Sequence, residues 1–81
     1  MFNNRTSDGR NNICGVKVAE LRKGLHISQR ELADRLQLID LDIDKNAVQR
    51  IESGQRFVTD IELISLAKVF SVSLEELLML K

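Results

Sequence analysis

Apolar residues recur every three or four positions along most of the chain, which is the spacing of amphipathic helices. The first stripe consists of Cys14, Val18, Leu21 and Leu25. Four shorter stripes follow it, and they comprise Leu32, Ala33 and Leu36; Ala47, Val48 and Ile51; Leu63, Leu66, Ala67 and Phe70; and Leu74, Leu77 and Leu78. Each stripe leaves one polar side, so the pattern predicts five short helices packed into one compact all-α bundle.

Four of the predicted helices have a marked beginning. Ser28, Thr59 and Ser73 are each followed by glutamate three residues later, which is the capping-box pattern, and Asp44 is a simpler cap. Apolar residues flank each cap at the spacing of a hydrophobic staple, and these pairs are Ile27 with Leu32, Ile43 with Val48, Val58 with Leu63, and Val72 with Leu77. Helix starts are therefore expected near these four caps, and Gly54 is expected to end the helix that follows Asp44.

The domain organisation follows from length and composition. A chain of 81 residues without proline makes one small domain. Residues 1–12 are polar and show no apolar period, so they are predicted to be a flexible N-terminal arm, and residues 13–81 to be the folded domain. Whether the arginines of this arm, Arg5 and Arg10, contact a partner or are simply solvated is left open at this point.

Charge and reactive residues exclude several classes of function. The 12 basic and 12 acidic residues cancel, so attraction to a polyanion would need a local basic surface. A single cysteine, Cys14, cannot form an intrachain disulfide, and with the single histidine, His26, it makes no structural zinc site. Cys14 is expected to be a buried small side chain and His26 to lie in a surface loop. No catalytic constellation is visible, so an enzyme, a metal and a cofactor are not expected.

Localisation is predicted from two further features. No apolar run reaches the roughly 18 residues of a membrane span. The first twelve residues also lack the apolar core of a secretory signal. A cytoplasmic location is therefore expected.

The segment after Asp44 carries the most informative side chains. Val48 and Ile51 form its apolar side, and the opposite side offers Lys45, Asn46, Gln49 and Arg50. Amide side chains can pair with adenine and cationic ones with guanine, and the major groove of DNA admits one helix. This segment is therefore a candidate reading helix, with a merely solvated helix face as the plain alternative.

Four stretches between Val18 and Leu78 resemble the phage lambda-type repressor family of helix-turn-helix domains, also called Cro-like or XRE. In chain order they read VAELRKG, SQRELADRL, NAVQRIESGQR and DIELISLAKVFSVSLEELL. The resemblance implies double-stranded DNA as the partner and a helix-turn-helix formed by the second and third helices. It implies base reading by Lys45, Asn46, Gln49 and Arg50, phosphate contacts by Ser28, Gln29, Gln55 and Arg56, and a structural ion pair between Arg22 and Glu52. Gln29 is also expected to brace the reading helix.

The chain departs from this family in the turn before the reading helix. The usual turn has three or four residues, whereas Gln37 to Ile43 intervene here, as in a subset of the family with an enlarged turn. The alternating Asp40, Asp42 and Asp44 begin like a calcium loop, but the required glycine and glutamate are replaced by Lys45 and Ile51. These acids are expected to point away from phosphate or to lower non-specific affinity for DNA.

The predicted function is that of a sequence-specific transcriptional regulator, a repressor that binds a palindromic operator as a homodimer. The fifth predicted helix and the tail from Leu77 to Lys81 hold more apolar residues than one small core needs, and this surplus is the expected dimer surface. The alternative is an antitoxin, or another protein-interaction module, of a toxin–antitoxin pair built on the same fold.

Overall fold

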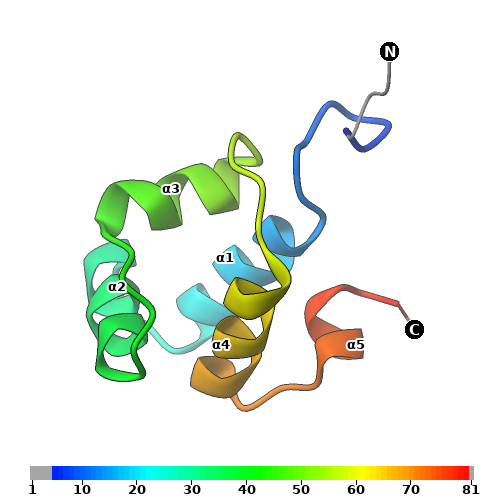
Figure 1. Cartoon of the computed structure of the whole chain (residues 1–81). Helices are drawn as coiled ribbons and strands as arrows, with labels where there is room; N and C mark the ends of the chain where they lie inside the picture. The colour runs from blue at the N-terminus through cyan, green and yellow to red at the C-terminus, as the bar shows by residue number, and fades with distance from the viewer. Residues whose placement is uncertain (1–4, 81) are drawn as a thin grey trace.

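The structure is a computed structural model that describes residues 5–80. Within that range it contains five helices, α1 (Cys14–Gly24), α2 (Gln29–Leu38), α3 (Lys45–Ser53), α4 (Asp60–Phe70) and α5 (Leu74–Leu77), and no strand (Figure 1). The predicted all-α fold with five helices is confirmed.

The helices begin at the predicted caps. The side chains of Ser28, Asp44, Thr59 and Ser73 each accept a hydrogen bond from the backbone amide three residues further on. At Ser28 and Thr59 the glutamate side chain also returns to the cap amide, so the capping box is complete. At Ser73 only the hydroxyl half forms, in which its Oγ accepts from the Glu76 amide at 3.0 Å.

The helices end in one common way. After each helix one residue adopts a left-handed backbone, and these residues are His26, Asp40, Gly54, Ser71 and Met79, with φ between 56° and 85°. The amide of the residue that follows bonds to a carbonyl five positions back, as Leu41 does to Leu36 and Val72 to Ala67. This is the Schellman ending, which usually uses glycine. Only one of the five positions, Gly54, is glycine, so only this helix end was predicted from the sequence.

The core is built from the inner faces of all five helices. Its most buried large residues are Val18, Leu32, Leu36, Val48, Ile51, Leu66 and Leu77. Cys14 is buried with them, and this burial raises the pKa of its thiol to about 11. Two residues predicted in the apolar stripes lie outside the core, since Leu25 and Leu74 are 48% and 43% exposed. Leu25 follows the last residue of α1, and Leu74 is the first residue of a four-residue helix, so the helical period does not direct either one inward.

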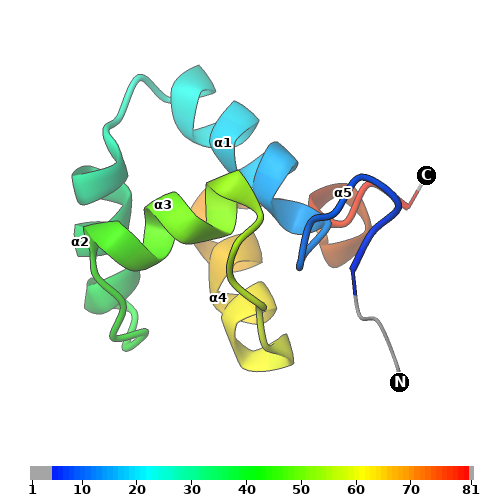
Figure 2. The same cartoon turned by 90° about the horizontal axis from the view of Figure 1, so that it is seen from above.

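Helix α3 lies along the outside of this bundle. It contacts α1 and α2, whereas α4 and α5 pack on other sides of α1. Figure 1 shows α3 along the top of the molecule, and Figure 2, seen from above, shows it in front of the other helices. One long side of α3 therefore faces away from the protein.

The enlarged turn occupies residues 39–44, because α2 extends to Leu38. Leu41 and Ile43 anchor it to the core, and the side-chain amide of Gln37 donates to the Ile43 carbonyl at 2.8 Å. Asp40 supplies the left-handed residue that ends α2, and Asp44 caps α3, so two of the three alternating acids have structural roles. The turn starts at the end of α2 that is remote from the outer side of α3 and rises from there to the start of α3 (Figure 1).

The N-terminal segment returns to the folded domain before α1. Residues 1–4 of the predicted arm lie outside the described residues. Thr6 and Arg10 bond to each other through the Thr6 amide and the Arg10 carbonyl at 2.7 Å, and residues 10–12 bond to the end of α3 and the loop after it. The flexibility of the arm stays a prediction, whereas these contacts show that its last three residues pack on the domain.

Gly15 lies where α1 passes close to the backbone of α3. A Cβ atom there would clash with the Ile51 carbonyl oxygen and would lie 2.7 Å from Asn12 Oδ1. Gly15→Ala is therefore expected to lower the free energy of unfolding by about 1–3 kcal/mol, because backbone rather than a flexible side chain must move. Urea denaturation followed by circular dichroism measures this change.

Gly24 provides the matched control at the other end of the same helix. A Cβ atom at Gly24 would have no neighbour within 4 Å. Gly24→Ala should leave stability unchanged or raise it by about 0.5–1 kcal/mol, through better helix propensity. Equal losses in the two variants would contradict the close approach of α1 and α3.

Candidate nucleic-acid interface

The outer side of α3 presents the four predicted base-reading residues together. Lys45, Asn46, Gln49 and Arg50 are all exposed, whereas Val48 and Ile51 on the opposite side are each 1% exposed. Gln49 lies four residues after Lys45, and Arg50 four after Asn46, so the side chains are neighbours on the helix surface. Within residues 5–80, none of the four makes a side-chain hydrogen bond or ion pair. We call this set the α3 stripe.

A shallow hollow between α2 and α3 adjoins this stripe. It is lined by Arg30, Ala33, Asp34, Gln37, Asp44 and Lys45. Two cations and two carboxylates face it, so its charge is balanced and it is not a strong anion site. In the part of the chain that the structure describes, no group of three histidine, cysteine, aspartate or glutamate residues could hold a metal ion.

Three of the predicted phosphate contacts flank the α3 stripe. Ser28 and Gln29 lie at the start of α2, and the Gln29 side-chain amide donates to Glu52 Oε1 at 3.0 Å. This bond is the brace expected between Gln29 and the third helix. Gln55 is exposed directly after α3, and its backbone amide bonds to the Arg50 carbonyl at 2.9 Å. Gln29 and Gln55 are thus both bonded to residues 50–52 in the C-terminal part of α3.

Arg56, the fourth predicted phosphate contact, is engaged within the protein. Its guanidinium binds both carboxylate oxygens of Glu62, at 2.8 and 2.9 Å. Hydrogen bonds from Arg56 hold the pKa of Glu62 below its usual value, and the Thr59 amide contributes to this shift. This pair was not predicted from the sequence, although the capping box places Glu62 beside the loop that carries Arg56. The charge of Arg56 is therefore largely neutralised in the folded chain.

Glu52 is the meeting point of the first three helices. Arg22 of α1 binds its two oxygens, with Nε to Oε2 at 2.7 Å and Nη2 to Oε1 at 3.1 Å. Arg22 also donates to the Ile27 carbonyl at 2.8 Å, and Gln29 of α2 supplies the third donor to Glu52. The Arg22 and Glu52 side chains are only 13% and 8% exposed. The pair therefore ties α3 to α1 and to the start of α2, away from solvent.

A second set of contacts, which was not predicted from the sequence, holds the end of α3. Arg10, Asn11 and Asn12 donate to carbonyls of α3 and of the loop after it. One signal for Asn12 was present in the sequence, since asparagine is a preferred residue at helix starts. The Asn12 Oδ1 atom does accept from the Gly15 amide in the first turn of α1, at 2.8 Å.

This arrangement of helices defines a class of protein. Helix α2, a turn and an outward-facing α3 that rests on α1 form a helix-turn-helix DNA-binding domain of the lambda-repressor type. A family model described as "Helix-turn-helix" matches residues 18–77, which is most of the chain, and the chain belongs to this family. Comparisons with curated proteins and with solved structures returned no match.

In residues 5–80 no helix has the length and apolar character needed to cross a membrane.

Removal of Arg22 tests the energetic weight of the Glu52 meeting point. Arg22→Met keeps the aliphatic part of the side chain but leaves a largely buried carboxylate without its cation. The free energy of unfolding should fall by about 3–5 kcal/mol, the range for breaking a buried pair. Lys23→Met is the control, because Lys23 is the next residue of α1 and is exposed, and it should change stability by less than about 0.5 kcal/mol. Similar small effects of both substitutions in urea denaturation would contradict the assigned role.

Proposed function

We propose that this protein is a sequence-specific transcriptional regulator that reads its operator with the α3 stripe. The observation that carries the proposal is the division of α3 into a buried apolar side and an exposed side of four side chains without partners among the described residues. Asn46 and Gln49 suit adenine, and Lys45 and Arg50 suit guanine. A regulator of this kind works where the chromosome lies, so we also propose a cytoplasmic location.

Contacts to phosphate would set the position of α3 in the groove. Ser28 and Gln29 lie at the start of α2, where backbone amides also favour an anion, and Gln55 lies directly after α3. Such contacts position a protein on DNA but do not distinguish sequences. We assign these three residues, and Arg56 when it is released from Glu62, to this positioning role.

We further propose repression by a homodimer on a palindromic operator. The domain measures 38 × 27 × 21 Å, which is comparable to the half-site spacing of about 34–36 Å on DNA. Two copies side by side could therefore present one α3 to each half-site. Leu74, Met79 and Leu80 are exposed and offer an apolar dimer surface, whereas Leu77 is buried in the core of its own chain. The antitoxin role stays an alternative prediction, which co-purification with a small toxin would favour.

Substitutions in the α3 stripe test base reading. Duplexes would be selected from a random pool, and Asn46→Ala and Gln49→Ala compared with the unchanged protein on the selected sequence and its single-base variants. Each substitution should cost about 1–3 kcal/mol of binding free energy and relax preference at one position of the site. Gln55→Ala should weaken binding to all sequences alike. Sedimentation of the same complexes should show two chains per palindromic duplex.

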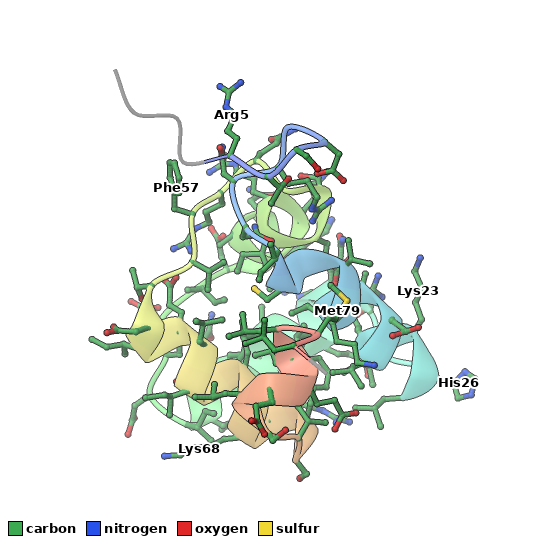
Figure 3. All side chains as sticks on the ribbon, turned by 90° about the vertical axis from the view of Figure 1, so that its right-hand side faces the viewer. Arg5, Lys23, His26, Phe57, Lys68 and Met79 are labelled. Carbon is green, nitrogen blue, oxygen red and sulfur yellow. The ribbon has the colours of Figure 1, made fainter. Side chains whose placement is uncertain are left out.

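Lys68→Ala is the control for these substitutions. Figure 3 shows Lys68 on α4 at the end of the molecule opposite to Arg5 and Phe57, remote from the side that α3 occupies. Its loss should leave both affinity and sequence preference unchanged. If the stripe variants weakened all duplexes equally, or if the unchanged protein bound no duplex in dilute salt, α3 would not be the reading helix.

Glu62→Gln tests whether Arg56 lies close enough to DNA to bind phosphate. Glutamine keeps an oxygen for the Thr59 amide but removes the charge that neutralises Arg56. Affinity for duplexes of any sequence should rise, and the slope of log K against log salt should steepen by about 0.9, the value for one further phosphate contact. Titration of a fluorescent duplex at several salt concentrations measures this slope.

Glu75→Gln provides the matched control, because it removes one negative charge from an exposed position on α5. If only long-range electrostatic attraction to DNA mattered, the salt slope would change equally in Glu62→Gln and Glu75→Gln. A slope that steepens equally in both, or in neither, would exclude a phosphate contact by Arg56.

A further inference from the structure

Arg10 lies against the C-terminal end of α3. Its Nη2 atom donates to the carbonyls of Ile51 and Glu52, at 3.3 and 2.8 Å, and its Nε atom donates to the Asn12 carbonyl at 3.4 Å. The last carbonyls of a helix have no partner within that helix and carry the negative end of its dipole. A guanidinium is therefore well matched to this position.

The side chain of Asn12 forms hydrogen bonds with both α1 and α3. Its Oδ1 atom accepts from the Gly15 amide in α1, while its Nδ2 atom donates to the Ile51 carbonyl at 3.1 Å and to the Arg56 carbonyl at 2.7 Å. Asn12 is 9% exposed, so these bonds are shielded from water. The start of α1 is thereby bonded to both the end of α3 and the loop after it.

Asn11 adds two bonds to the same loop. Its backbone amide donates to the Gly54 carbonyl at 2.7 Å, and its side-chain amide to the Gln55 carbonyl at 2.9 Å. Residues 10–12 thus supply donors to five carbonyls between residues 51 and 56. We call these three residues the N-terminal clamp.

Two glycines leave room for the clamp. A Cβ atom at Gly54 would lie 2.9 Å from Arg10 Cγ, and one at Gly15 would lie 2.5 Å from Arg10 Nη2. Arg10 therefore passes between α1 and the end of α3 through a space that exists because neither helix carries a side chain there. This fit distinguishes the clamp from an incidental surface contact.

We propose that the N-terminal clamp positions the reading helix and thereby contributes to sequence discrimination. The clamp lies outside residues 18–77, which are the residues that the family model matches. It holds the turn of α3 that follows Arg50 and the loop that carries Gln55. The proposal rests on the function proposed above, in which the α3 stripe contacts bases.

The first test uses the free protein and needs no DNA. Arg10→Met removes the donors of Arg10, and Asn12→Asp keeps the oxygen that caps α1 but places a carboxylate against two carbonyls. Hydrogen exchange should be at least about tenfold faster at the Gln55 amide, which bonds to the Arg50 carbonyl at the end of α3. The Val72 amide has the equivalent bond at the end of α4 and should keep its rate.

The second test measures discrimination. Both clamp variants should lose about tenfold in the ratio of affinities for the selected duplex and a random one, with an unchanged salt slope. Lys23→Met removes a cation from the far end of α1 and should leave this ratio unchanged.

Three results would overturn the proposal. If hydrogen exchange became equally faster at the Gln55 and Val72 amides, the clamp would contribute only to global stability. A salt slope reduced by about 0.9 in Arg10→Met would make Arg10 a phosphate contact instead. An unchanged ratio, despite faster exchange at Gln55, would separate the clamp from recognition. If the unchanged protein bound no duplex, the proposed function would fail, and the exchange data would still decide whether residues 10–12 hold α3.

Discussion

The orientation of α3 depends on one carboxylate. Glu52 comes directly after the buried Ile51 and receives hydrogen bonds from Arg22 of α1 and Gln29 of α2. A rotation of α3 about its axis would remove Glu52 from these donors and would expose Ile51. Both the polar network and the apolar core therefore favour the same rotation of the helix, and that rotation turns the α3 stripe toward solvent.

Each end of α3 is held by its own contacts. At the start, the Asp44 side chain accepts from the Ala47 amide, and Ile43 packs in the core beside it. At the end, the left-handed Gly54 closes the helix, and Arg10 and Asn12 donate to the carbonyls of Glu52 and Ile51. A helix fixed in this way loses little further conformational freedom when it meets a partner, which favours tight and selective association.

Contacts between residues close together in the sequence could be predicted from it, whereas most contacts between distant residues could not. Caps and staples join residues three to five positions apart, so the starts of α2 to α5 were predicted from the sequence. The helix ends were harder, because Asp40 and Ser71 adopt a backbone that normally signals glycine. The contact of Asn12 with the Arg56 carbonyl spans 44 positions and exists only once α1 and α3 have packed. The Arg22–Glu52 pair spans 30 positions, and only resemblance to a family pointed to it.

Three of the arginines have their guanidinium groups engaged within the protein, and this bears on mechanism. Arg10, Arg22 and Arg56 all direct their guanidinium groups to acceptors of the chain itself. Binding of DNA through released counterions requires cations that face phosphate, and it confers affinity without regard to sequence. A protein that commits three arginines internally gives up much of that general affinity. If α3 reads bases as proposed, its binding must then rest largely on hydrogen bonds from the four side chains of the stripe, and non-specific binding should be weak relative to operator binding.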